Sequence, residues 1–197
     1  MSMIHLKLLS GLALLALGSA AHAHTGLGAH GIADGLSHPF GADHLLAMLA
    51  VGVWSVSALP ASRVWMGPTT FMAALVVSAA LGAAGLSVPF LEHAIALSVM
   101  LFGGMLMLAG RPWPMGVGLA WIAAAASLHG LAHGAEAPQG AFAPYALGFL
   151  ATTGALHLAG VGLGVAIRRW LSGVSTSVLT GLGAALSFAG AYLFSQV

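Results

Sequence analysis

The chain of 197 residues is 59% hydrophobic, and only 5% of its residues are charged. Since a water-soluble domain usually carries about 25% charged residues, this composition excludes a soluble globular domain and predicts a chain that folds in lipid. Five basic residues cannot form a phosphate-binding face, so no nucleic-acid partner is expected. The absence of cysteine excludes disulfides and thiolate ligands, which leaves imidazole, carboxylate, thioether and backbone groups for a metal site.

Residues 1–23 have the pattern of a secretory signal peptide. Lys7 supplies the positive charge, an apolar stretch too short to span a membrane follows, and Ala21-His22-Ala23 matches the small-x-small site that signal peptidase cuts. An uncleaved first helix is the alternative. We predict cleavage, so that the mature chain, residues 24–197, begins at His24 outside the cytoplasmic membrane of a bacterium.

The mature chain divides into six hydrophobic spans separated by short polar or Pro/Gly breaks. Each is close to the ~20 residues that a helix needs to cross about 30 Å of hydrocarbon. The expected spans cover residues 39–58, 66–86, 90–110, 113–134, 143–166 and 174–195. Pro39 suits the first turn of the first span. The predicted fold is therefore all-α, a polytopic membrane bundle of six transmembrane helices in one domain.

The arginines predict how this bundle is oriented. They are Arg63, Arg111, Arg168 and Arg169, and all fall in the loops that follow spans one, three and five. With the mature N-terminus outside, these loops lie in the cytoplasm, as the positive-inside rule requires. The expected location is the bacterial inner membrane, crossed several times.

Ionisable side chains gather near the predicted outer ends of three spans. They are Asp43 and His44 in the first span, Glu92 and His93 in the third, and His129, His133 and Glu136 at the end of the fourth. Each alone could sit at the lipid headgroups or complement a helix dipole. Several ionisable groups at one membrane depth are costly, however, and they favour a shared functional site.

The spacing of these residues predicts metal binding. His129 and His133 are four residues apart, so they share one helix face about 6 Å apart and can chelate one ion. Glu136 follows on the same side. Asp43 and His44 lie about 100° apart, so one could bind the ion while the other supports it. Imidazole with carboxylate suits nickel, cobalt, zinc or iron.

Further histidines lie on either side of this group. His30, Asp34 and His38 recur at intervals of four, which a helical segment would line along one face. The amine and imidazole of His24 could form a chelate after cleavage, or the terminus could be disordered. His157 lies deeper, in the fifth span, as a relay on the inward path or as a core histidine bonded to a neighbouring helix. We favour the core histidine.

Residues 38–44, His-Pro-Phe-Gly-Ala-Asp-His, and the following Met48 resemble the H-P-x-x-G-x-D-H-x-x-x-M signature of HupE/UreJ family nickel/cobalt permeases. The same stretch matches the H-x4-D-H element of the larger NiCoT nickel/cobalt transporters. The resemblance extends to the signal peptide, the six spans, the Glu92-His93 pair and the 129–136 cluster. It implies uptake of nickel or cobalt ions, with the first-span motif and the later histidine/glutamate cluster as the essential residues.

The predicted function is therefore a permease, not an enzyme, that takes up nickel or cobalt as its transported substrate from periplasm to cytoplasm without an organic cofactor. The expected ligands are His24, His30, Asp34, His38, Asp43, His44, Glu92, His93, His129, His133 and Glu136. The expected partners are the divalent ion and the lipid bilayer, and a homo-oligomer is left open. Two alternatives are an intramembrane zinc-dependent hydrolase, since such enzymes also carry His-x-x-x-His pairs, and a metal-binding assembly or sensor subunit.

Overall fold

The computed structural model describes residues 31–111, 114–137, 140 and 142–197. The signal peptide, His24 and His30 therefore lie outside the described residues. The helices are α2 Ile32–Ser37, α3 Ala42–Ala58, α4 Met66–Ala83, α5 Leu91–Met107, α6 Met115–Glu136, α7 Phe142–Trp170 and α8 Ser175–Phe194, with short 3-10 turns η1 His38–Phe40, η2 Ala61–Arg63 and η3 Ser172–Val174. No strand occurs in these ranges, so the all-α prediction is confirmed.

Each of the six predicted spans coincides with one long helix, α3 to α8, but the helices differ in their capacity to cross a membrane. Four helical segments of the described chain are long and apolar enough: Ala61–Ala83, Met115–Glu136, Phe142–Trp170 and Ser172–Phe194. Helix α5 has only 17 residues. The segment Ile32–Phe40 and α3 pass the same test only together, as a pair bent by 74°. The chain is thus a helical membrane protein with four candidate spans, or five with the bent pair.

The beginning of the first span differs from the prediction. Pro39 does not open a long helix, because it lies in the one-turn η1, and α3 begins three residues later at Ala42. The chain turns at Gly41, whose φ of −52° and ψ of 140° are not helical. Before the turn, α2 packs on α7 through close backbone contact between Gly35 and Gly148. This bend positions the two halves of the sequence motif separately.

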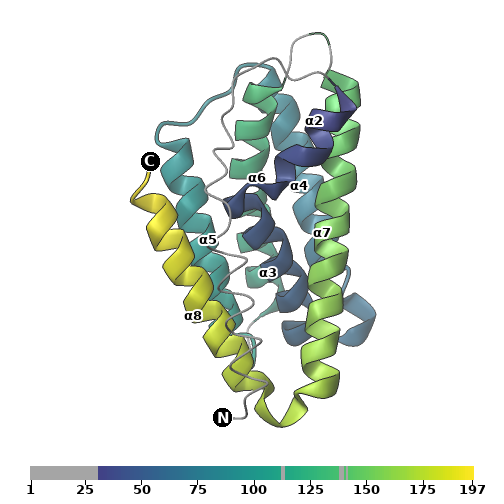
Figure 1. Cartoon of the computed structure of the whole chain (residues 1–197), viewed down its shortest axis with the longest axis vertical. Coiled ribbons are helices and arrows are strands. Elements are labelled where there is room, and N and C mark those ends of the chain that lie inside the picture. The colour runs from purple at the N-terminus through teal and green to yellow at the C-terminus, as the bar shows by residue number, and fades with distance from the viewer. Residues whose placement is uncertain (1–30, 112–113, 138–139, 141) are drawn as a thin grey trace.

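The long helices pack mainly in pairs, α4 with α6, α5 with α8, and α3 with α7 (Figure 1). Small residues lie where the backbones meet, as expected in lipid, where no hydrophobic force drives helices together. A methyl group at Gly52 of α3 would lie 2.6 Å from the carbonyl carbon of Gly160 of α7. At Gly134 of α6 it would strike the backbone of Ala79 of α4. These contacts fix the register of the helices that carry the site.

The bundle has two chemically different ends. The arginine end holds Arg63, whose Nη1 lies 3.7 Å from Sδ of Met115, and Arg168, whose Nη1 donates to the carbonyl of Val56. The opposite end, where α3, α5 and α7 begin and α6 ends, carries histidines and carboxylates, and we call it the histidine end. The predicted segregation of the loops is therefore present in the fold.

Candidate metal site

Four histidines from two separate parts of the chain form one connected cluster at the histidine end. His38 Nε2 lies 2.9 Å from His133 Nδ1, and His133 Nε2 lies 3.0 Å from His44 Nδ1. His44 Nδ1 also lies 3.3 Å from His129 Nδ1. The side chain of His38 is 17% exposed and that of His133 11%, whereas His44 and His129 are 1% and 0% exposed. The cluster therefore leads from the surface into the core.

The bend at Gly41 explains why His38 and His44 both reach His133. In a continuous helix, side chains six residues apart point in directions about 120° apart around the axis and cannot both contact one side chain. Here His38 lies in η1 and His44 in the first turns of α3, on opposite sides of the bend. The H-x4-D-H spacing thus produces a convergent pair of imidazoles only because the helix is broken between them.

In His129 and His44, a hydroxyl group lies next to Nε2, the ring nitrogen that faces away from the cluster, and this determines which nitrogen carries the lone pair. Ser98 donates its hydroxyl proton to the Ile95 carbonyl at 2.7 Å, so its oxygen is the acceptor for His129 Nε2–H at 3.2 Å. The lone pair of His129 is then on Nδ1, facing His44. In His44, Nε2 lies 3.4 Å from the Thr153 hydroxyl, which leaves Nδ1 for the cluster. This is how metal-ligating histidines are usually oriented.

Three ring nitrogens consequently converge on one point: Nδ1 of His44, Nδ1 of His129 and a nitrogen of His133. Their ligand atoms all lie within 4.8 Å of one another. A metal–imidazole bond of about 2.0–2.1 Å, as for zinc, places neighbouring ligands about 2.9–3.4 Å apart. Two of the three separations, 3.0 Å from His133 to His44 and 3.3 Å from His44 to His129, match the edges of such a coordination polyhedron. The arrangement can therefore hold a divalent cation with imidazole ligands.

Carboxylates surround the outer side of the cluster. Glu136 Oε2 lies 3.6 Å from His38 Nε2 and 3.9 Å from His133 Nδ1, and these three residues form a second group with metal-ligand spacing. Asp43 and Glu92 line the same small pocket. Three of the four acidic side chains in the whole chain thus meet at one pocket, which attracts cations to the surface end of the histidine cluster.

Aromatic and hydroxyl side chains that the sequence did not single out enclose the site. Phe149 of α7 packs against three of the imidazoles, with ring centroids 4.6 Å from His133, 5.1 Å from His44 and 6.0 Å from His38. The hydroxyl groups of Ser98 and Thr153 contact the buried His129 and His44. Their only signal in the sequence is that they are hydroxyl residues within strongly apolar spans.

The remaining predicted residues lie elsewhere. His93 points away from the cluster, and its ring packs 5.9 Å from Phe90 and 5.0 Å from Phe194. Asp34 lies in the first turn of α2 and is not among the residues that line the pocket. His157 bonds through Nδ1 to the carbonyl of Thr153 in its own helix, at 2.8 Å, and not to a neighbouring helix as predicted for a core histidine.

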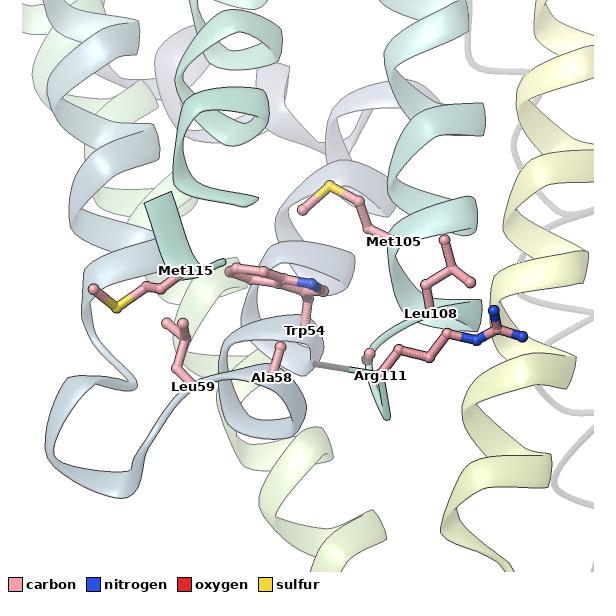
Figure 2. A pocket seen from close by; sticks show the side chains of 8 residues that line it. Trp54, Ala58, Leu59, Met105, Leu108, Arg111 and Met115 are labelled. Carbon is pink, nitrogen blue, oxygen red and sulfur yellow. The ribbon is translucent and has the colours of Figure 1, made fainter. Parts of the chain in front are cut away.

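A second cavity lies at the arginine end, between α3, α5 and α6. Figure 2 shows the indole of Trp54 between Met105 and Met115, while the guanidinium of Arg111 extends away from the indole. The cavity volume of about 20 Å³ has room for roughly one water molecule. Among the described residues that line this cavity, the only ionisable group is the cationic Arg111, which repels a divalent cation.

The fold and the site together define a helical membrane protein with a candidate metal site near one end. The family model described as HupE / UreJ protein matches residues 12–193, and the chain belongs to this family. It is 41% identical over 189 residues to Protein HupE of Rhizobium leguminosarum bv. viciae, covering 95% of this chain and 96% of that protein. No solved structure matches the chain.

Membership in the family settles the class of function. HupE/UreJ proteins are transporters, generally of nickel and cobalt, so the prediction that the chain is not an enzyme is confirmed and the hydrolase alternative is excluded. The family also agrees with the several apolar helices of the fold, which belong to a multi-pass membrane protein.

Proposed function

We propose that the protein takes up nickel or cobalt ions from the periplasm into the cytoplasm across the bacterial inner membrane. The proposed topology has six crossings after a cleaved signal peptide, with α5 and the bent α2–α3 segment each completing a span. The histidine end then faces the periplasm, because the positive-inside rule assigns the arginine end to the cytoplasm. The observation that carries the proposal is the convergence of three carboxylates and four histidines on one pocket and its buried extension.

The pocket and the histidine cluster have different roles in ion entry: the pocket attracts the ion and the cluster coordinates it. Asp43, Glu92 and Glu136 attract the hydrated cation, and His38 with His133 replaces part of its water shell. The ion then passes to the buried group of His44, His129 and His133, where neutral imidazoles coordinate it without a carboxylate. Exchangeable oxygen and nitrogen ligands let the ion leave again, which a transporter requires. His93 is outside the proposed set because its ring faces Phe194.

Uptake of nickel into proteoliposomes by an Asp43→Asn variant tests this function. The amide has nearly the size of the carboxylate but carries no charge, so we expect uptake to fall to background while the protein remains folded. Asp34→Asn is the matched control, because it removes a carboxylate that lies outside the pocket lining. Wild-type uptake of both nickel and cobalt by Asp43→Asn would contradict the proposed role of the pocket.

A further inference from the structure

His157 is a buried histidine whose chemistry the outer cluster does not explain. It lies in α7 and is 2% exposed. Its Nδ1 lies 2.8 Å from the Thr153 carbonyl oxygen, and because a carbonyl can only accept, Nδ1 carries the proton. The lone pair of the neutral ring is then on Nε2. Among the residues that the structure describes, none offers this nitrogen a hydrogen bond.

A buried polar atom without a partner is rare and calls for an explanation. The state of His157 is the one that metal-ligating histidines usually adopt, with one nitrogen donating to a carbonyl and the other bare. A purely structural histidine would gain stability by bonding Nε2 to a neighbouring group. The lone pair on Nε2 of His157 is thus available to coordinate a metal ion.

A thioether lies at the same level of the bundle. Helices α3 and α7 run in the same direction, because His44 contacts Thr153 and, further along both helices, Gly52 contacts Gly160. Met48 lies one turn beyond His44, and His157 one turn beyond Thr153, so this register places them at the same level of two packed helices. Met48 is completely buried. Imidazole suits nickel, and a thioether, which is a softer ligand, would add only weak coordination to it.

Phe71 lies between the outer cluster and His157. The centroid of its ring is 5.9 Å from that of His129, 6.4 Å from that of His44 and 5.1 Å from that of His157. Thr153 joins the two levels as well, since its hydroxyl faces His44 and its carbonyl accepts from His157. The deeper level is therefore adjacent to the cluster but separated from it by an aromatic ring.

We propose that His157 Nε2 and the Met48 thioether form an inner binding site that receives the divalent ion from the outer cluster on its way to the arginine end. This inference rests on the proposed transport function and adds a second binding site to the transport pathway. The inner site offers fewer ligands than the outer cluster and no carboxylate, so it holds the ion more weakly. Weak binding at successive sites is what permits an ion to leave a selective pathway.

Uptake of nickel into proteoliposomes tests the transfer step. His157→Ala should reduce the rate by roughly tenfold or more, in the range that loss of a supporting group costs at metal sites. Leu156→Ala is the matched control, because it opens a cavity at the neighbouring buried position of α7 without removing a ligand. Met48→Leu keeps the volume and removes the sulfur, and it should slow uptake as well. Equal rates in His157→Ala and Leu156→Ala would overturn the inner site.

Cobalt titration of the purified full-length protein in detergent gives a readout that does not depend on transport. The wild type should bind cobalt tightly at the outer cluster and more weakly at a second class of site, and His157→Ala should lose only the weaker class. Loss of the tight class in His157→Ala would place His157 in the outer cluster and refute a separate site. If the wild type bound cobalt but moved no metal, the transport function would fail, whereas selective loss of the weaker class would still support the inner site.

Discussion

At the scale of the residue, the orientation of each imidazole decides whether the cluster can hold an ion. A histidine in a hydrogen-bonded core can present either nitrogen, and only one choice directs lone pairs toward a common point. Ser98 makes that choice for His129, because its own proton is used on the Ile95 carbonyl. In the proposed site, Ser98 is thus a positioning residue that would act on the ion through His129.

Replacing Ser98 by alanine should weaken nickel binding by roughly 10–100-fold, the usual cost of losing a group that orients a metal-ligating histidine. The ring of His129 would lose its acceptor and could turn its proton toward the cluster. Isothermal titration of the purified variant measures the change. Ser55→Ala is the control, since Ser55 is equally buried and bonds only to the carbonyl of Val51 in its own helix. Unchanged affinity in Ser98→Ala would show that His129 needs no such support.

The main candidate ligands could be grouped from the sequence, but the hydroxyl residues that support them could not. His44, His129 and His133 could be grouped because hydropathy gives membrane depth and helical spacing gives a face. Serine and threonine carry no such signal, because in apolar helices they bond mostly to their own backbone, as Ser55 does. His93 has the right depth but the wrong direction around α5, which depth alone cannot reveal.

At the scale of the element, the six apolar stretches predicted the long helices within a few residues, because the bilayer dictates the length of a span. The bend in the first span was not predicted, although it brings His38 and His44 together at His133 in the candidate site. Pro39 suggested a helix start, whereas the chain instead turns at Gly41 after a short 3-10 segment. The bend depends on α2 docking against α7, where Thr152 donates to the Leu36 carbonyl at 2.9 Å. Such a distant contact is not encoded in local periodicity.

Helix α6 depends on close contact with α4, and this contact supports the site. Gly134, next to His133, faces the backbone of Ala79, so Gly134→Ala must push the helices apart. We expect a loss of about 1–3 kcal/mol in the free energy of unfolding, as for other overpacked interfaces, and weaker nickel binding. Gly104→Ala in α5 is the control, because open space surrounds that position. Thermal unfolding in detergent compares them, and equal stability would contradict the packing argument.

At the scale of the whole molecule, charge is distributed between the two ends. The carboxylates Asp43, Glu92 and Glu136 line the pocket at the histidine end, and Arg63, Arg111 and Arg168 lie at the other. A divalent cation is therefore attracted at one end and meets positive charge at the other. This asymmetry favours loading at the histidine end, and the membrane orientation decides whether loading there means uptake.

The orientation can be measured directly because the chain has no cysteine of its own. Ser87→Cys introduces one thiol in the exposed α4–α5 loop at the histidine end, and Ser172→Cys introduces one in exposed η3 at the arginine end. A membrane-impermeant maleimide added to intact spheroplasts should label Ser87→Cys alone, and Ser172→Cys should react only after permeabilisation. Both variants replace an exposed serine by a residue of similar size, so the fold should be unaffected. The reverse labelling pattern would place the carboxylate pocket in the cytoplasm, and the same site would then load ions for export.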